Sequence, residues 1–273
     1  MYSPRIAAAA SWFPRSMIVA IGLATWLGAA KTPAAIITIT NNLASEYLAM
    51  EQASTTGVNP NGPWTYGGYD DLTTPLFTPF GPAQHVENLG TSVGLTSGQL
   101  QGYGFDNANI IPALVVNTTA GNVTICCGID PYAPGEIFVH SANASDYTPQ
   151  VPPGAYNLPT VRYTALYDGV ADVNITFTKK HTGNITYDIY LNGGFLAGNA
   201  IVTAQGTSQT YINNGLSLQQ GDTLDFIIGG RASAAIDGTI SLAVQVPEPS
   251  TLALLGLALC GAAAKTRRRR TAA

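Results

Sequence analysis

The sequence has few charged residues, few histidines and no pattern of paired metal ligands. Charged residues make up only 10% of the chain, which argues against a long solvated helix or coiled coil, because both need charged faces. Only three histidines occur, at positions 85, 140 and 181, and neither His-x-x-x-His nor Cys-x-x-Cys is present. We therefore expect no zinc site and no resident cofactor.

Cysteine is also scarce. Two of the three cysteines, Cys126 and Cys127, are adjacent, and Cys260 lies in an apolar segment near the C-terminus. In an oxidising compartment the adjacent pair would be either two thiols or a strained vicinal disulfide. Both states are favoured over a redox centre, and the sequence does not choose between them.

Acidic and basic residues are segregated along the chain. All 16 acidic residues lie between positions 35 and 250, where they outnumber basic residues 16 to 4 and leave a net charge of −12. A surface this acidic repels phosphate backbones, so nucleic acid is not an expected partner. The remaining basic residues lie at the two ends.

The N-terminal region is typical of a secretory signal peptide. Two arginines precede an apolar run over residues 17–27, and small residues follow it. This pattern predicts a signal helix within residues 1–34 that the Sec machinery exports and signal peptidase removes near Ala30 or Ala34. A membrane anchor or buried helix is the alternative, but the run is shorter than the roughly 20 residues that a span needs.

The C-terminal region has three parts: a Pro-Glu-Pro tripeptide, a short apolar segment over residues 251–264, and an arginine cluster. A helix over residues 252–264 is roughly 20 Å long at 1.5 Å per residue, which is short for a hydrocarbon core of ~30 Å. Arginines that reach the interface and local thinning would let it span, with the cluster on the cytoplasmic side. The tripeptide is Pro247, Glu248 and Pro249, and the cluster is Arg267, Arg268, Arg269 and Arg270.

In this order, the three parts of residues 246–270 resemble the PEP-CTERM protein-sorting domain, also catalogued as the ice-binding protein C-terminal domain. The resemblance implies recognition by an exosortase and processing at Pro247–Pro249. It also implies a transient stay in the inner membrane, followed by release to the cell surface or the medium. The alternative is an ordinary tail anchor. The ice-binding name implies no such activity here, because no regular Thr-x-Thr repeat runs through the body.

The body, residues 35–245, is expected to be one all-β domain, an antiparallel β-sandwich. Apolar and polar residues alternate over residues 173–178, 185–191, 224–228 and 240–245, and a period of two predicts strands with one buried face. Turn signals separate these segments at residues 181–184, 192–194 and 220–222.

The first half of the body is less regular. Residues 41–52 fit a helix, with Asn42 as its N-cap. Residues 36–40, 114–116 and 123–126 fit strands. The proline-rich stretch over residues 149–159 predicts a crossover or an edge, because proline donates no ladder hydrogen bond.

Several pieces of the body resemble surface proteins that carry PEP-CTERM tails. The piece at residues 216–226 is also common in jelly-roll carbohydrate-binding modules, which implies a jelly-roll-like sandwich but names no ligand. Two departures are Tyr163, where the group often has tryptophan, and residues 168–172, which lack the usual Pro-Gly turn. The matching pieces are residues 59–67, 161–165, 187–193 and 216–226.

Two motifs with catalytic or metal-binding associations have plainer interpretations. Residues 90–94 match Gly-x-Ser-x-Gly, which marks a nucleophile only at a strand–turn–helix elbow; here the surroundings predict a polar loop. Asp70 and Asp71, with turn aspartates elsewhere, are candidate calcium ligands, although Asx turns explain them equally simply. Those other aspartates are Asp130, Asp168 and Asp237.

Four aromatic residues of the first half of the body are candidate glycan contacts, because aromatic rings pack against the C–H faces of sugars. The alternative is ordinary β-propensity, since tyrosine favours strands and the edges of sandwiches. The four residues are Trp64, Tyr66, Tyr69 and Tyr103.

Taken together, the sequence predicts an exported cell-surface or matrix protein rather than an enzyme. The expected role is structural or adhesive, within extracellular polysaccharide or biofilm. The alternative is a lectin-like carbohydrate-binding module. A hydrolase would need a clefted catalytic constellation, which the sequence does not display.

Overall fold

The computed structural model describes most of the body and neither end of the chain. The predicted signal peptide, the Pro-Glu-Pro tripeptide, the apolar segment, the arginine cluster and all three cysteines lie outside the described residues. The described residues are 35–53, 57–72, 76–91, 94–96, 98–105, 111–125, 131–142, 156–198, 204–230 and 232–246.

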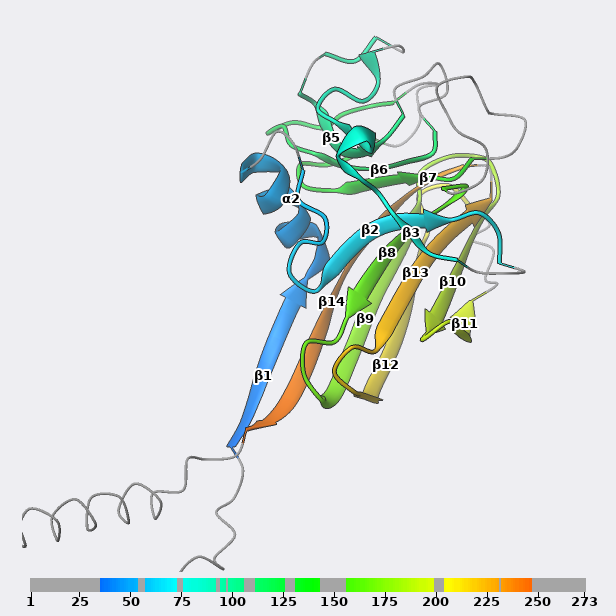
Figure 1. Ribbon diagram of the computed structural model, residues 1–273. Coiled ribbons are helices and arrows are strands. Elements are labelled where there is room, and N and C mark those ends of the chain that lie inside the picture. The colour runs from blue at the N-terminus through cyan, green and yellow to red at the C-terminus, as the bar shows by residue number, and fades with distance from the viewer. Residues whose placement is uncertain are drawn as a thin grey trace, which may run out of the picture. The chain divides into compact units, whose positions relative to one another are not determined.

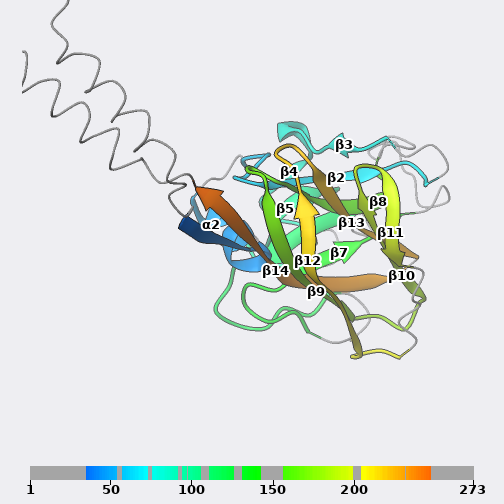
Figure 2. The same ribbon diagram turned by 90° about the horizontal axis from the view of Figure 1, so that it is seen from below.

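Most described residues belong to two antiparallel sheets (Figure 1). The larger sheet has eight strands in the order β12-β9-β14-β7-β6-β5-β4, with β1 also paired to β14; Figure 2 shows β12, β9 and β14 side by side. Its strands are β1 (Ala35–Asn42), β4 (His85–Val86), β5 (Leu100–Gly104), β6 (Ala113–Asn117), β7 (Ile137–His140), β9 (Gly169–Lys179), β12 (Ser208–Leu218) and β14 (Ser233–Val246).

The smaller sheet has six strands in the order β11-β10-β13-β8-β2-β3. Short helical segments, α2 (Leu43–Ala53) and η1 (Pro82–Gln84), accompany the two sheets. The strands are β2 (Trp64–Tyr69), β3 (Thr78–Pro79), β8 (Leu158–Thr164), β10 (Ile185–Leu191), β11 (Gly194–Gly198) and β13 (Thr223–Gly230).

Strands β7 to β14 pair in a nested order. β10 pairs with β11, β9 with β12, β8 with β13, and β7 with β14, each pair antiparallel. The chain alternates between the sheets along this path, apart from the β10–β11 hairpin. That hairpin turns at Asn192 and Gly193, whose φ angles of 51° and 76° suit the twist of two-residue hairpins.

The alternating patterns of the sequence correspond to the strands that enclose the main core. The alternating apolar positions of residues 173–178, 185–191, 224–228 and 240–245 form one cluster shared by both sheets, with the half-buried Leu191 packed against it. Ile227 breaks the alternation: it is buried but lies outside this cluster. Period-two alternation thus predicted four strands and the face that each one buries. The all-β prediction with two antiparallel sheets is confirmed.

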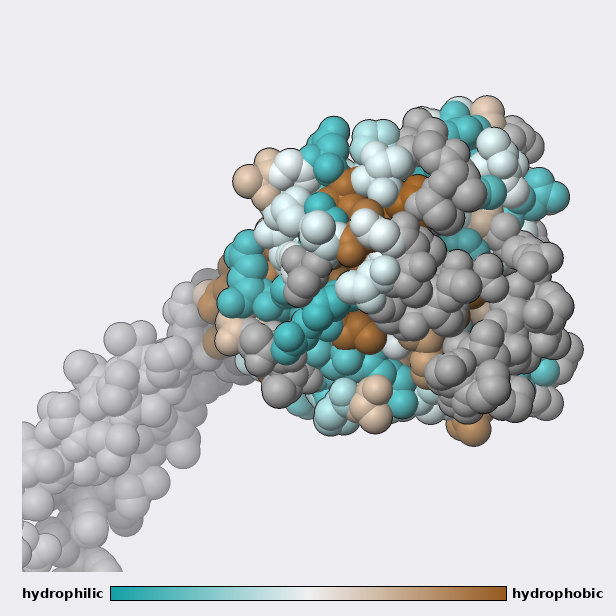
Figure 3. Space-filling view, turned by 90° about the horizontal axis from the view of Figure 1, so that it is seen from above, coloured by the Kyte–Doolittle hydropathy of each residue, from teal (hydrophilic) through white to brown (hydrophobic). Residues whose placement is uncertain are grey.

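A second, smaller apolar cluster lies on the other side of the larger sheet, around β5, β6 and β7. It contains Leu100, Val115 and Phe138 together with residues of the adjoining loops. Side chains cover both faces of the larger sheet at β6, so every residue of this strand is buried. Figure 3, which views the molecule from above, shows apolar residues framed by hydrophilic ones at this end.

The less regular first half follows the predictions in part, since β2, β3, β4, β5 and β7 were not predicted. β1 and β6 contain the strands expected at residues 36–40 and 114–116. The strand expected at residues 123–126 is reduced, within the described residues, to a single bridge between Val123 and Tyr132.

The helix predicted over residues 41–52 is confirmed as α2, and its N-cap is Asn42. The Asn42 Oδ1 accepts a hydrogen bond from the Ser45 amide at 2.8 Å, and the Glu46 Oε1 accepts one from the Asn42 amide at 2.8 Å. These reciprocal contacts satisfy backbone donors that a helix start leaves unpaired.

We expect Asn42→Ala to lower the free energy of unfolding by about 1 kcal/mol, because it removes this cap. Asn42→Asp is the matched control, since its carboxylate still accepts the Ser45 amide. Urea denaturation followed by circular dichroism measures both changes. Equal stability of the alanine variant and the parent chain would contradict the capping role.

None of the helices in the described part of the chain is both long enough and apolar enough to cross a membrane.

Candidate functional site

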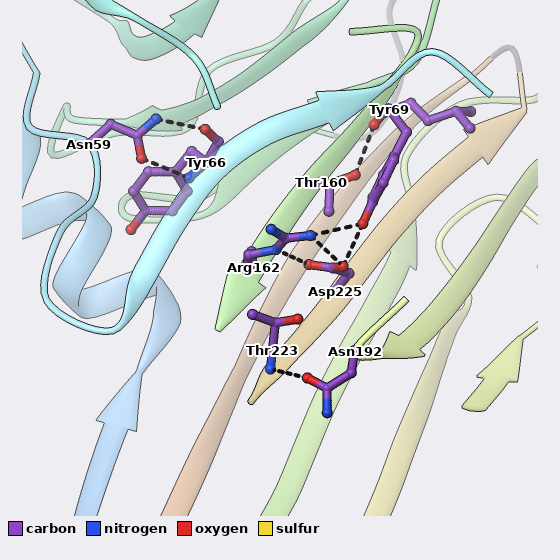
Figure 4. Close-up of polar contacts among 9 residues, drawn as sticks. Asn59, Tyr66, Tyr69, Thr160, Arg162, Asn192, Thr223 and Asp225 are labelled. Atoms are coloured by element: carbon purple, nitrogen blue, oxygen red, sulfur yellow. Dashed lines mark hydrogen bonds and ion pairs between the residues drawn. The ribbon is translucent and has the colours of Figure 1, made fainter. Parts of the chain in front are cut away.

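The Asn-Pro-Asn-Gly segment at residues 59–62 has an architectural role. The Asn59 Nδ2 donates to the backbone oxygens of Tyr66 at 2.7 Å and Phe80 at 2.8 Å, and its Oδ1 accepts from the Tyr66 amide at 2.9 Å (Figure 4). The Asn61 Nδ2 donates to the Glu46 carbonyl at 3.0 Å. One side chain thus completes the edge of β2, and the other ties that edge to α2.

The four predicted glycan-contact residues are buried in the structure. Trp64 and Tyr66 are 0% exposed, Tyr103 is 1% exposed and Tyr69 is 2% exposed. Tyr66 stacks on Tyr47 with ring centroids 4.3 Å apart, and Trp64 meets Tyr163 edge to face at 5.2 Å. A ring without exposed surface offers a sugar no face to stack on. The glycan contact of these four residues stays a prediction, and none of their rings is exposed in this conformation.

Burial also sets the acidity of these tyrosines. It raises the pKa of Tyr47 and Tyr66 well above the ordinary value of a phenol, and nearby glutamates add to this effect. The Tyr47 hydroxyl donates to the Leu114 carbonyl at 2.6 Å. The Tyr47 hydroxyl is therefore a neutral hydrogen-bond donor within the fold.

The other candidate motifs are described only in part, since Ser92 and Asp130 lie outside the described residues. The described residues of the Gly-x-Ser-x-Gly segment lie in the loop between β4 and β5, not at a strand-to-helix turn, and Ser92 lies outside them. Asp168 Oδ1 accepts from the Gln220 amide at 2.7 Å, and Asp237 Oδ1 from the Gly238 amide at 2.7 Å. Across the described ranges, no group of three or more acidic, histidine or cysteine residues has the arrangement of a metal site.

A charged network that the sequence analysis missed lies on the outer face of the smaller sheet (Figure 4). The Asp225 carboxylate, which is 0% exposed, accepts from the Arg162 Nε at 2.6 Å and Nη2 at 2.9 Å. The Tyr69 hydroxyl donates to the same carboxylate at 2.5 Å and accepts from the Arg162 Nη2 at 3.0 Å. The Arg162 guanidinium also lies 3.8 Å from the centre of the Phe77 ring.

Two neighbouring strands bring Arg162 and Asp225 together, since they are direct partners in the register of β8 and β13. On β13 the flanking Leu224 and Phe226 belong to the core, so the carboxylate between them points to the opposite face. Burial and the Asp225 carboxylate both raise the pKa of the Tyr69 hydroxyl. A single charge inside an apolar strand was the sequence signal for this network.

The network belongs to a longer row of directly paired residues that crosses the smaller sheet. From β11 to β2 the partners are Phe195, Tyr190, Asp225, Arg162 and Thr65. Phe195 is 56% exposed and meets Tyr190 edge to face, with centroids 5.7 Å apart. We call this set, together with Phe77 above Arg162, the cross-sheet row.

A separate groove of about 570 Å³ lies on the outer face of the larger sheet, beside the start of α2. Its lining includes the hydroxyls of Ser45, Thr176 and Thr178 and the carboxylates of Glu136 and Asp237. Lys180 pairs with Glu136 at 2.7 Å, and Thr178 shares a hydrogen bond with Ser208 at 2.8 Å. The lining also includes apolar side chains such as Leu48 and Pro134. The groove is therefore mixed in character, and part of its hydrogen-bonding capacity is already used within the protein.

Comparison with known proteins identifies the C-terminal region. The family model of the PEP-CTERM protein-sorting motif matches residues 245–270. The chain carries a PEP-CTERM sorting motif. This motif indicates export to the cell surface or the medium and implies recognition by an exosortase. The matched residues overlap the end of β14. The family model does not cover the rest of the sandwich.

No curated protein matches this chain. Solved structures with a distant likeness include the CBM36-1 domain of a multidomain xylanase from the hindgut metagenome of Trinervitermes trinervoides. It is 13% identical, with 49% of this chain and 98% of that chain covered and a TM-score of 0.29.

Two further structures are similarly distant. CBM51 from Clostridium perfringens GH95, in complex with methyl-galactose, is 10% identical, with 41% of this chain and 73% of that chain covered and a TM-score of 0.27. A family 29 carbohydrate-binding module is 11% identical, with 50% of this chain and 90% of that chain covered and a TM-score of 0.25. At these scores the role of the sandwich has to be argued from its own residues.

Proposed function

We propose that the PEP-CTERM protein is delivered to the cell surface through its C-terminal tail and serves there as a structural or adhesive, non-enzymatic component of extracellular polysaccharide or biofilm. The observation that carries this proposal is the sorting motif at residues 245–270. In the proposed sequence of events, the Sec machinery and signal peptidase act on residues 1–34. The segment over residues 251–264 then holds the chain in the inner membrane until an exosortase acts at Pro247–Pro249.

The proposal extends to the connectivity of the sandwich. The nested pairing of β7 with β14, β8 with β13, β9 with β12 and β10 with β11 supports a jelly-roll-like order. Such a scaffold leaves the outer face of the β10–β11 hairpin and of β12 partly exposed, where contacts with a matrix can form. The acidity of the body disfavours nucleic acid as the matrix component.

The sorting step is tested by Glu248→Ala in a host that contains an exosortase. We expect the variant to keep its full C-terminal tail and to remain in the inner-membrane fraction, whereas the parent chain loses the tail and leaves that fraction. Gln245→Ala, just before the tripeptide, is the matched control and should behave as the parent. Release of the Glu248→Ala variant with the same C-terminus as the parent would remove the sorting proposal.

A lectin-like carbohydrate-binding role for the sandwich is the second candidate. The cross-sheet row favours it, because it joins an exposed aromatic side chain to hydrogen-bonding groups on one face. Binding sites for small polar ligands commonly combine apolar rings with a few fixed polar groups. Calcium remains a proposal for the turn aspartates alone, and titration calorimetry with calcium would test it.

A further inference from the structure

The cross-sheet row has a fixed geometry. Apart from Phe77, its members are register partners on adjacent strands from β11 to β2, and the register of β10 with β11 shifts between Ile189 and Tyr190. Adjacent strands lie about 4.8 Å apart, so the row from Phe195 to Thr65 is about 19 Å long. Because the strands of the sheet set these spacings, the row is an extended, preorganised surface and not a flexible loop.

Aromatic rings lie at both ends of the row. Tyr190 and Phe195 form an edge-to-face pair on the β10–β11 hairpin. Toward β2, Phe77 covers the guanidinium of Arg162 and meets Tyr69 edge to face at 5.7 Å. Phe195 is 56% exposed, so its ring is accessible to a ligand. Rings separated along a line suit a ligand with repeated apolar faces.

The polar centre of the row is fixed and electrically balanced. The Asp225 carboxylate neutralises the Arg162 guanidinium, whose side chain remains 23% exposed. The hydrogen bonds of Arg162 to described residues use its Nε and Nη2, and the guanidinium has a further donor group in Nη1. The row therefore offers hydrogen-bond donors without a net positive charge.

The charge of the surrounding protein then selects the ligand class. The stretch from residue 35 to residue 250 has 16 acidic residues against 4 basic ones, so it repels polyanions. A neutral row on an acidic protein is complementary to an uncharged ligand that carries hydroxyl groups and apolar C–H faces. A linear neutral glycan has both features, and an extended row can contact several of its units.

We propose that the cross-sheet row binds a neutral linear glycan, with Phe195, Tyr190 and Phe77 contacting sugar faces and Arg162 donating hydrogen bonds to hydroxyls. This inference rests on the lectin-like candidate and assigns it a site. The groove beside α2 is not part of this site, because it lies on the larger sheet.

The test is titration calorimetry of the full-length protein in detergent with cellohexaose, xylohexaose and mannohexaose, and with hexagalacturonate as the acidic probe. We expect at least one neutral hexaose to bind. Phe195→Ala should weaken that binding by about tenfold or more, because it removes an aromatic contact. Tyr167→Ala is the matched control: Tyr167 is also exposed, at 49%, and lies outside the row. It should leave binding unchanged.

The possible outcomes separate this inference from the proposals on which it rests. Binding of a neutral hexaose that neither Phe195→Ala nor Tyr190→Ala weakens would overturn the row and keep the lectin-like candidate. Preference for hexagalacturonate would overturn the neutral ligand class. Absence of binding to every hexaose would overturn both the row and the lectin-like candidate, and it would leave the sorting proposal intact. Unchanged thermal unfolding of Phe195→Ala assigns its lost affinity to the contact.

Discussion

Trp64→Ala should lower the free energy of unfolding by about 3–5 kcal/mol, the cost of emptying a large aromatic site in a core. Trp64 is 0% exposed and lies between the inner faces of the sheets, against Tyr163. Its removal leaves a cavity that the surrounding strands fill only in part. Urea denaturation followed by far-UV circular dichroism measures the change, because this signal reports the backbone and not the tryptophan ring.

The matched control for Trp64 is Tyr167→Ala, an exposed aromatic residue whose loss should change stability by no more than about 0.5 kcal/mol. A Trp64→Ala protein that is destabilised no more than the Tyr167→Ala control would contradict the core position of this ring. The result also bears on binding experiments, because weaker glycan binding by Trp64→Ala would report damage to the fold. Variants of the exposed Phe195 avoid that ambiguity.

Asp225→Ala should destabilise the protein by about 3 kcal/mol, near the lower end of the range for breaking a buried ion pair. The substitution leaves Arg162 and the Tyr69 hydroxyl without the carboxylate that both contact. The lower end applies because the Arg162 side chain is 23% exposed, and water can partly solvate it. The urea midpoint, at an unchanged denaturant slope, gives the difference.

Two companion variants make the Asp225 result specific. Asp237→Ala removes an exposed carboxylate from β14 and should change stability by no more than about 0.5 kcal/mol. The double variant Arg162→Met/Asp225→Leu should recover much of the loss, because it leaves no unpaired charge behind. A loss below about 1 kcal/mol for Asp225→Ala would show that the network adds little to the fold.

Local pattern was enough to predict much of the fold. Alternation around Ile175, Ile189, Phe226 and Leu242 identified both the strands and their buried faces, because a strand places successive side chains on opposite faces. The cap of α2 was readable for a similar reason, since Asn42 and Glu46 act within one helical turn. In both cases the interacting groups are close in sequence.

The candidate site was harder to predict because its parts are distant in sequence. Arg162 and Asp225 meet only through the pairing of β8 with β13, and Tyr69 joins them from β2. Sheet order and register decide such meetings, and composition does not encode them. Aromatic content also proved a weak guide: it directed attention to Trp64 and Tyr66, which are buried, and away from Phe195.

The exposed rings show why burial has to be known before a binding role is assigned. Tyr66 and Tyr190 both lie on strands of the smaller sheet, but Tyr66 faces the core and Tyr190 faces outward beside Phe195. The same residue type therefore serves packing in one place and is available for contact in the other. A one-residue difference in strand phase separates these roles.

The most direct test of the central claim is the intact mass of the protein recovered from a host with an exosortase and from the same host after deletion of that enzyme. We expect the first host to yield a shorter chain, because processing at Pro247–Pro249 removes Arg267–Arg270. The second host should yield a chain that retains all four arginines and the three residues after them. Recovery of the complete tail in equal amount from both hosts would contradict the claim that these residues are a sorting signal.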